Sequence, residues 1–260
     1  MPVLGVCGDS WFAATQELDR KDCRDSKGKH FSEMLAKKLN YDLYTLARGA
    51  CSNSAIRLQI SELVKRKVDF IIVGVTTANR IEYPRHDNKK FVPDKGIHNI
   101  CYDLHPDQSS DNVNANYSTM YSDTLTNIFG NNDNNSGPVR SEEQREAIKN
   151  YYLEVFDIDF RETQDAWIIA SGIQEIRDAK IPYLLLGYPW LDNTKYFNKG
   201  NDREILYDAG RGLVPACRVK GPINTHRRWH TTDEEQAKIA ETLHKHITQK
   251  SLLQFTQNSL

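Results

Sequence analysis

Residue types suited to nucleophilic attack on an ester occur at widely separated places in this chain. Ser10 follows a short apolar run, Gly49 follows a second β-rich segment, and His230 precedes the last amphipathic segment. Ester hydrolysis by serine needs such a hydroxyl, an imidazole base and N–H donors for the developing oxyanion. Taken alone, Asp9-Ser10 is more often a turn or a helix cap. The hypothesis therefore depends on whether the fold brings these residues together.

Alternating strand and helix patterns supply the elements that would position them. Short apolar runs predict strands at residues 3–7, 41–46, 68–73 and 183–188, with a weak fifth strand at 213–214. Helical spacing predicts five apolar stripes: Phe31-Met34-Leu35-Leu39, Ile56-Ile60-Leu63-Val64 after a Ser52 cap, Ile148-Tyr151-Tyr152-Val155, Trp167-Ala170-Ile173-Ile176 and Ile239-Ala240-Leu243-Ile247. This alternation predicts an α/β fold built on a parallel sheet.

The loops that follow the predicted strands carry the candidate residues. In a parallel sheet ordered 2-1-3-4-5, the loops after the first and third strands flank the point where ligands bind. Ser10 follows the first strand, Gly49 the second, and Thr76 and Asn79 the third. We therefore expect these residues to meet at the carboxyl edge of the sheet, together with His230 from the start of the final helix.

This ordered set resembles the SGNH, or GDSL, hydrolase family. Gly8-Asp9-Ser10 matches its first block, Gly49 within Leu46-Ala47-Arg48-Gly49-Ala50 its second, and His230 its last. The resemblance implies a flavodoxin-like, three-layer α/β/α sandwich and hydrolysis of esters, often acyl or acetyl groups on lipids or sugars. It implies Ser10 as nucleophile, His230 as base, the Ser10 and Gly49 amides as oxyanion donors, and no cofactor.

Two positions depart from the family pattern. The third block, Gly-x-Asn-Asp, reads Gly74-Val75-Thr76-Thr77 here, so Thr76 stands at the asparagine position. Either the Thr76 hydroxyl or Asn79 could donate to the oxyanion, and with even odds Thr76 and Thr77 simply cap the turn. The last block, Asp-x-x-His, has Arg227 in place of its acid.

The base therefore needs another acceptor to set its tautomer. We favour a backbone carbonyl from residues 224–228, because it needs no further side chain. The carboxylates of Asp192, Asp202 and Asp208 are the alternatives nearest by topology.

Composition limits the remaining possibilities. The length, 260 residues, suits a single domain covering residues 1–260, and 34 Lys plus Arg against 35 Asp plus Glu give no electrostatic case for nucleic acid or a membrane surface. Five scattered cysteines without a CxxC pair argue against a disulfide framework or a metal site. Without a basic leader or a run of 18 apolar residues, we expect a cytoplasmic protein with no membrane span. The oligomeric state stays open.

A polar insert interrupts the alternation between residues 84 and 140. It is rich in Asn, Asp and Ser, including the run at 131–137, and leaves the third strand at the expected site. A lid and a disordered loop are equally good interpretations. The tail, residues 251–260, is predicted to fray.

Several aromatic and imidazole side chains are more simply explained by structural roles than by a role in the site. Trp11, Phe12 and Trp190 could form an apolar or sugar-stacking wall, but such residues more often belong to the core. The histidines other than His230 are expected on the surface or in loops.

Three function classes follow. The first is a serine esterase acting on a small-molecule, carbohydrate or lipid ester through an acyl-enzyme on Ser10. The second is a degenerate member of the same fold that acts as a binding protein or a virion-type structural protein, because the family acid and asparagine are missing. The third, a phosphate-binding flavodoxin-like domain, is weak because the first loop lacks a glycine-rich cradle.

Overall fold

The structure is a computed structural model of the 260-residue chain. It describes residues 1–9, 12, 30–47, 52–76, 78, 82–84, 117–119, 142–187, 191, 197, 202–206 and 233–254.

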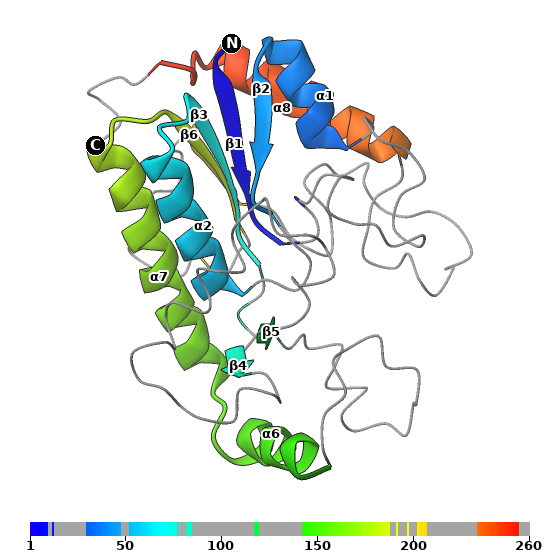
Figure 1. The fold of residues 1–260 in the computed structure, drawn as a ribbon, viewed down its shortest axis with the longest axis vertical. Helices are drawn as coiled ribbons and strands as arrows, with labels where there is room; N and C mark the ends of the chain where they lie inside the picture. The colour runs from blue at the N-terminus through cyan, green and yellow to red at the C-terminus, as the bar shows by residue number, and fades with distance from the viewer. Residues whose placement is uncertain are drawn as a thin grey trace.

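A five-stranded parallel sheet forms the centre of the molecule (Figure 1). Its strands are β1 (Val3–Cys7), β2 (Asp42–Thr45), β3 (Phe70–Gly74), β6 (Tyr183–Gly187) and β7 (Glu204–Leu206). Their order is β2-β1-β3-β6-β7, and every neighbouring pair is parallel. The predicted order 2-1-3-4-5 is confirmed. β3 and β6 are buried along their whole length, as strands covered on both faces must be.

Helices cover both faces of this sheet and give the predicted three layers (Figure 1). One face carries α1 (Phe31–Leu39) and α8 (Asp233–Gln249), which bury a core containing Leu4, Phe70 and Leu243. The other carries α2 (Asn53–Lys65) and α7 (Ile158–Asp178), which bury Ile60, Ile71 and Ile173. Gly172 of α7 packs directly against α2, because a Cβ there would overlap the Ile60 side chain.

Local sequence signals explain most helix boundaries. Ser52 caps α2 as predicted, its side chain accepting a hydrogen bond from the Ala55 amide at 3.2 Å. Asn40 ends α1 in the left-handed conformation, with φ 59°. The predicted stripe of α8 is confirmed, since Ile239, Ala240, Leu243 and Ile247 are all buried.

Two predicted stripes are wrong in part. In α7 the buried positions include Asp165, Ala166, Ile169, Gly172, Ile173 and Ile176, while Trp167 is 48% exposed. α6 (Glu142–Glu154) forms as predicted, yet Tyr151 is 39% exposed and Val155, just beyond the helix, is 69% exposed. For α6 the reason is visible in Figure 1, where this helix lies beyond the sheet and away from the helices that cover it.

The fifth strand and the tail also differ from expectation. The fifth strand of the sheet is β7, ahead of the Leu213-Val214 piece, which lies outside the described residues. Residues 251–254 are anchored rather than frayed, because the buried Arg203 guanidinium donates to the carbonyls of Leu252 (2.8 Å) and Gln254 (2.6 Å). Burial lowers the pKa of Arg203, an effect that nearby Tyr183 opposes.

Within the insert, the structure describes a pair of short strands. β4 (Glu82–Pro84) and β5 (Tyr117–Thr119) are antiparallel, with Tyr83 opposite Ser118. The rest of residues 84–140 lies outside the described residues, so the lid stays a prediction.

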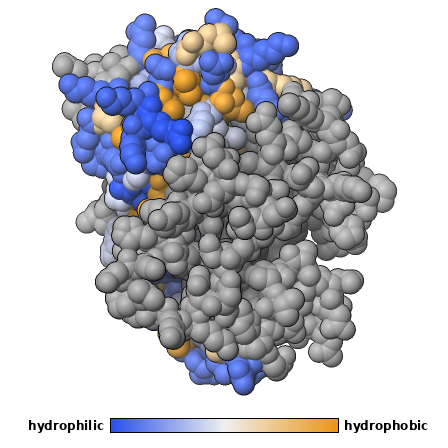
Figure 2. Space-filling model, viewed as in Figure 1, coloured by the Kyte–Doolittle hydropathy of each residue, from blue (hydrophilic) through white to orange (hydrophobic). Residues whose placement is uncertain are grey.

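Among the described helices, none is long and apolar enough to cross a bilayer. On the face shown in Figure 2, the described residues are largely hydrophilic, with some hydrophobic ones at the end that carries α1 and β2. The exposed large hydrophobic residues of the described part, other than Met1, lie on or between α6 and α7: Tyr151, Leu153, Val155, Ile158, Phe160 and Trp167.

Candidate functional site

The segment that carries Ser10 is fixed on both sides. Gly8 leaves β1 with φ 151°, a conformation that favours glycine, and its N–H donates to Gln59 Oε1 at 2.7 Å. Asp9 is buried, and its carbonyl accepts from the Phe12 N–H at 3.0 Å. Ser10 itself lies outside the described residues. The flanking contacts anchor the chain that enters and leaves it at the carboxyl end of β1.

Phe12 fills the space between the ends of β1 and β3. Its ring is buried, and a Cβ on either Gly8 or Gly74 would overlap it. The ring also meets Phe31 edge-on, with centroids 5.8 Å apart and planes at 84°. Phe12 is therefore a core residue, the more common of the two interpretations. Trp11 and Trp190 lie outside the described residues.

The loop after β3 is joined to the loop after β1 by Thr76. Thr76 is buried, and its hydroxyl donates to Asp9 Oδ2 at 2.8 Å. Its N–H donates to Asn53 Oδ1 at 3.0 Å, and its carbonyl accepts from Asn53 Nδ2 at 3.1 Å. Thr76 thus lies at the expected edge of the sheet, with its one hydroxyl proton directed at Asp9. Asn79, the other candidate donor, lies outside the described residues.

A buried network extends from Thr76 into α7. Asn53 Nδ2 also donates to Asp165 Oδ2 at 2.6 Å, and Asp165 pairs with Arg161 at 2.9 Å. Asn53, Gln59 and Asp165 were not among the predicted site residues, although the sequence carries a signal for them. These polar residues lie at stripe positions, Asn53 seven residues before Ile60 and Asp165 four before Ile169. Buried polar residues on an apolar stripe are the informative exceptions.

The segment leading to Gly49 lies beside the end of β1. The Leu46 N–H donates to the Val6 carbonyl at 2.8 Å, and Ala47 is buried. Gly49 lies outside the described residues, three residues after Leu46. The chain therefore leaves β2 next to the strand that leads to Ser10.

The start of α8 is joined to the start of α1. The Phe31 N–H donates to Gln236 Oε1 at 2.7 Å, and both residues are buried. Because α1 connects the end of β1 to the start of β2, its first turn lies at the carboxyl edge of the sheet. The first turn of α8 lies there too. His230 lies outside the described residues, six residues before Gln236.

One candidate partner for His230 lies at the wrong end of α8. Asp202 precedes β7, its carbonyl lies 2.6 Å from His246 Nε2, and its carboxylate lies 3.1 Å from Lys250 Nζ. A helix of this length spans roughly 25 Å, so Asp202 is remote from the start of α8. Asp192 and Asp208 follow the carboxyl ends of β6 and β7 in the sequence, although both lie outside the described residues.

His30 is neither a surface nor a loop side chain, which corrects the expectation for that residue. It is the buried N-cap of α1, with Nδ1 accepting from the Ser32 amide at 3.3 Å. Its ring also packs against that of Phe31, with the two ring centroids 4.6 Å apart. His30 therefore helps to fix the first turn of α1.

Neither a protein-family model nor a curated protein sequence matches this chain. Several solved structures are similar. TesA shares 12% identity, with 95% of this chain and 98% of that one covered, at a TM-score of 0.45. A protein described as a putative lipolytic protein of the G-D-S-L family, from Desulfitobacterium hafniense DCB-2, shares 9% identity, with 95% of this chain and 99% of that one covered, at a TM-score of 0.45. The acetyl xylan esterase Est2A from Butyrivibrio proteoclasticus shares 13% identity, with 97% of this chain and 65% of that one covered, at a TM-score of 0.46.

Proposed function

We propose that this protein is a serine esterase with Ser10 as nucleophile and His230 as base. One chain of contacts supports the proposal: Phe12, two residues after Ser10, meets the ring of Phe31, and the Phe31 amide binds Gln236 of α8. His230 lies only six residues before Gln236. Because an extended chain covers at most about 3.6 Å per residue, this short segment keeps His230 within reach of the end of β1. Residues 220 positions apart in the sequence thus have a route to one site.

The chemistry follows the acyl-enzyme route. Ser10 Oγ attacks the ester carbonyl carbon while His230 takes the hydroxyl proton, and the resulting oxyanion accepts from the Ser10 and Gly49 amides. Collapse breaks the bond to the alcohol, which leaves with the proton from His230. Water then gives up a proton to His230 and attacks the acyl carbon. The bond between Ser10 Oγ and the acyl carbon breaks, Ser10 Oγ takes the proton back from His230, and the acid is released.

Two roles remain to be assigned: the third hydrogen-bond donor to the oxyanion and the acceptor that orients His230. The Thr76 hydroxyl proton is directed at Asp9, so Asn79 is the better candidate for the third donor. A carbonyl of residues 224–228 orients His230, with Asp192 and Asp208 as the alternatives. The ester substrate belongs to the small-molecule, carbohydrate or lipid class.

Covalent labelling tests the proposal. A fluorophosphonate probe should modify the wild-type protein at Ser10, and Ser10→Ala and His230→Ala should each abolish labelling and turnover of p-nitrophenyl acetate. Ser171→Ala removes an exposed hydroxyl of α7 and should label like the wild type. Arg227→Ala, Asp192→Asn, Asp202→Asn and Asp208→Asn should each cost less than about tenfold in turnover.

A second candidate, the non-catalytic binding or virion-type protein, has one specific observation in its favour. Arg227 stands where the family acid is expected, and mispairing of a catalytic histidine costs about 10⁴ in turnover in the chymotrypsin-type example. Absence of labelling in the folded wild-type protein would favour this candidate. Loss of several hundredfold in Asp192→Asn or Asp208→Asn would instead identify the acid and exclude the carbonyl.

A further inference from the structure

Asn53 is the centre of the buried network and has all of its side-chain hydrogen-bonding groups occupied. Its Oδ1 accepts from the Thr76 N–H, and its two Nδ2 hydrogens go to the Thr76 carbonyl and Asp165 Oδ2. The amide therefore pairs with both backbone groups of Thr76, as a neighbouring strand would. This pairing fixes the position and the rotation of the Thr76 peptide at the end of β3.

Asp165 fixes Asn53 in turn. Its carboxylate is buried and receives the short 2.6 Å hydrogen bond from Asn53, while Arg161 lies 2.9 Å away and balances its charge. A charged acceptor makes a stronger hydrogen bond than a neutral one, especially away from water. The amide of Asn53 is thereby held with its nitrogen toward α7 and its oxygen toward the Thr76 N–H.

The network links α7 and the loop after β3 to the segment that carries Ser10. Thr76 of that loop and Asp165 of α7 both bind the same Asn53 nitrogen. Through its hydroxyl, Thr76 then holds the buried carboxylate of Asp9, the residue that directly precedes Ser10. Movement of Asn53 would therefore reach Ser10 through only two intervening residues.

We infer that Asn53 and Asp165 are positioning residues of the esterase, acting on Ser10 through Thr76 and Asp9. This inference rests on the proposed function. The pair does not touch the reacting atoms, so its loss should change the rate of acylation more than substrate binding. Small displacements of a reacting group of about 1 Å can cost on the order of 10²-fold in rate.

The same two helices provide a matched control. Arg57 of α2 pairs with Glu175 of α7 at 2.6 Å and donates to Ser171 Oγ at 2.9 Å. These residues link α2 to α7 as Asn53 and Asp165 do, but their hydrogen bonds and ion pair within the described part of the chain stay on the two helices. A variant at Glu175 thus perturbs the helix pair alone.

The test compares Asn53→Asp, Asp165→Asn, the double variant and Glu175→Gln. Asn53→Asp keeps the shape but places two carboxylates together, and should lower the fluorophosphonate labelling rate and kcat by about 10- to 100-fold with KM within about twofold. In Asn53→Asp/Asp165→Asn the two carboxylates no longer face each other, but the carboxylate at position 53 cannot donate to the Thr76 carbonyl, so labelling should stay at least about tenfold below the wild type. Glu175→Gln should label within about twofold of the wild type.

A milder variant covers the case in which Asn53→Asp fails to fold. Asp165→Asn can still turn its amide oxygen toward Asn53, and should lower kcat by about threefold to tenfold while KM is unchanged. Labelling of Asp165→Asn and Asn53→Asp at the wild-type rate would overturn the inference and leave the proposed function intact. So would a double variant that labels at the wild-type rate. A wild-type protein that does not label at all would overturn the proposed function and this inference with it.

Discussion

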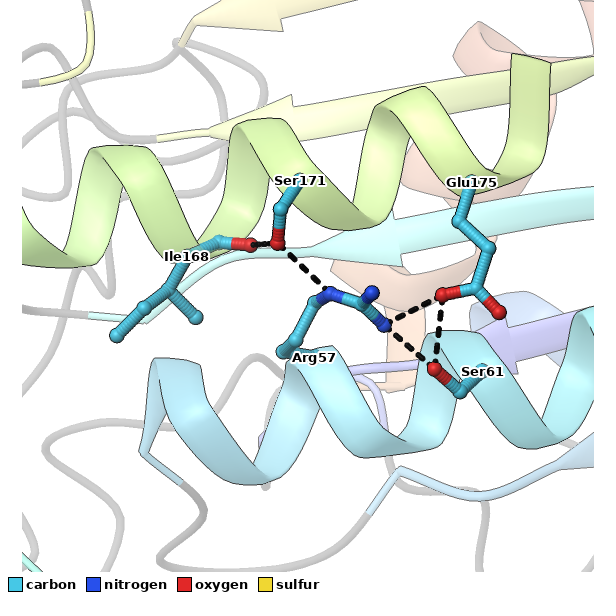
Figure 3. Close-up of polar contacts among 5 residues, drawn as sticks. All are labelled: Arg57, Ser61, Ile168, Ser171 and Glu175. Atoms are coloured by element: carbon cyan, nitrogen blue, oxygen red, sulfur yellow. Dashed lines mark hydrogen bonds and ion pairs between the residues drawn. The ribbon is translucent and has the colours of Figure 1, made fainter. Parts of the chain in front are cut away.

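Two polar networks join α2 to α7, and they differ in burial and in what else they contact. In the first, Arg57 and Ser61 of α2 meet Ser171 and Glu175 of α7, with the Arg57 and Glu175 side chains 26% and 32% exposed (Figure 3). In the second, Asn53 and Asp165 are buried. Water can replace lost partners in the first network but not in the second. The same helix pair should therefore respond very differently to equivalent changes.

Their connections differ as well. The Arg57 network includes one backbone group, the Ile168 carbonyl that accepts from Ser171 Oγ at 2.7 Å (Figure 3). The Asn53 network binds both backbone groups of Thr76 and extends to Asp9 at the end of β1. One network joins two helices, whereas the other sets the positions of two loops at the carboxyl edge of the sheet.

The largest difference is expected for removal of the acidic partner. Asp165→Ala leaves the Arg161 charge and an Asn53 N–H without their buried acceptor, and should lower the free energy of unfolding by about 3–5 kcal/mol. Glu175→Ala should cost less than about 1 kcal/mol, because both of its partners can turn to water. Urea denaturation of the two variants measures both values. Equal losses would mean that burial does not distinguish the networks.

An intermediate effect is expected at the link between the two loops. Thr76→Val keeps the shape of the side chain but removes the hydroxyl that donates to Asp9, and should cost about 1–3 kcal/mol of unfolding free energy. Thr76→Ser keeps the donor and should recover most of that loss. Thermal denaturation of both variants tests this. If Thr76→Val is as stable as the wild type while Thr76→Ser is destabilised, the methyl packing matters rather than the hydrogen bond.

The sheet and its layers could be predicted from the sequence because their signals are local. Runs such as Phe70-Ile71-Ile72-Val73 are continuous and apolar, and the stripe of α8 has its large residues on the buried face. β7 escaped prediction because this edge strand has only three residues, Glu204, Ile205 and Leu206. A strand so short shows no period.

The stripe of α7 was misplaced for a physical reason. Its buried face contains Asp165 and Gly172, a charge and a residue without a side chain, while the large Trp167 lies on the exposed face. Hydrophobic periodicity follows side-chain size and so selects the tryptophan. Which face of α7 is buried is decided instead by the close packing of Gly172 on Ile60 and by the pairing of Asp165 with Asn53.

Of the candidate site, the sequence predicted that the loops after β1 and β3 lie together, as the Thr76–Asp9 hydrogen bond shows, but not what holds them. The edge contact of Phe12 with Phe31 and the Phe31–Gln236 hydrogen bond, across 205 positions, depend on tertiary packing that no spacing reveals. Thr76 was considered as an oxyanion donor or a turn cap, whereas its hydroxyl binds Asp9. The roles of Ser10, Gly49, Asn79 and His230 stay predictions, as does the single-domain assignment of residues 1–260.

The smallest expected effect is a difference between the networks in how salt changes the stability cost of removing a charge. Glu175→Gln removes the charge from the Arg57 pair but keeps a side chain that can still bind Ser61 and Arg57. The Coulomb contribution of a pair this exposed is screened when the Debye length falls from about 10 Å at 0.1 M salt to about 3 Å at 1 M. We therefore expect the cost of Glu175→Gln to be under about 1 kcal/mol at low salt and to approach zero in 1 M NaCl. Asp165→Asn removes the same charge from a buried pair, where ions do not penetrate, so its cost should be nearly independent of salt.

Urea denaturation of both variants at the two salt concentrations measures this difference. A cost of Asp165→Asn that also vanishes in 1 M NaCl would place the Asn53 network in contact with solvent, and the contrast between the two networks would fail.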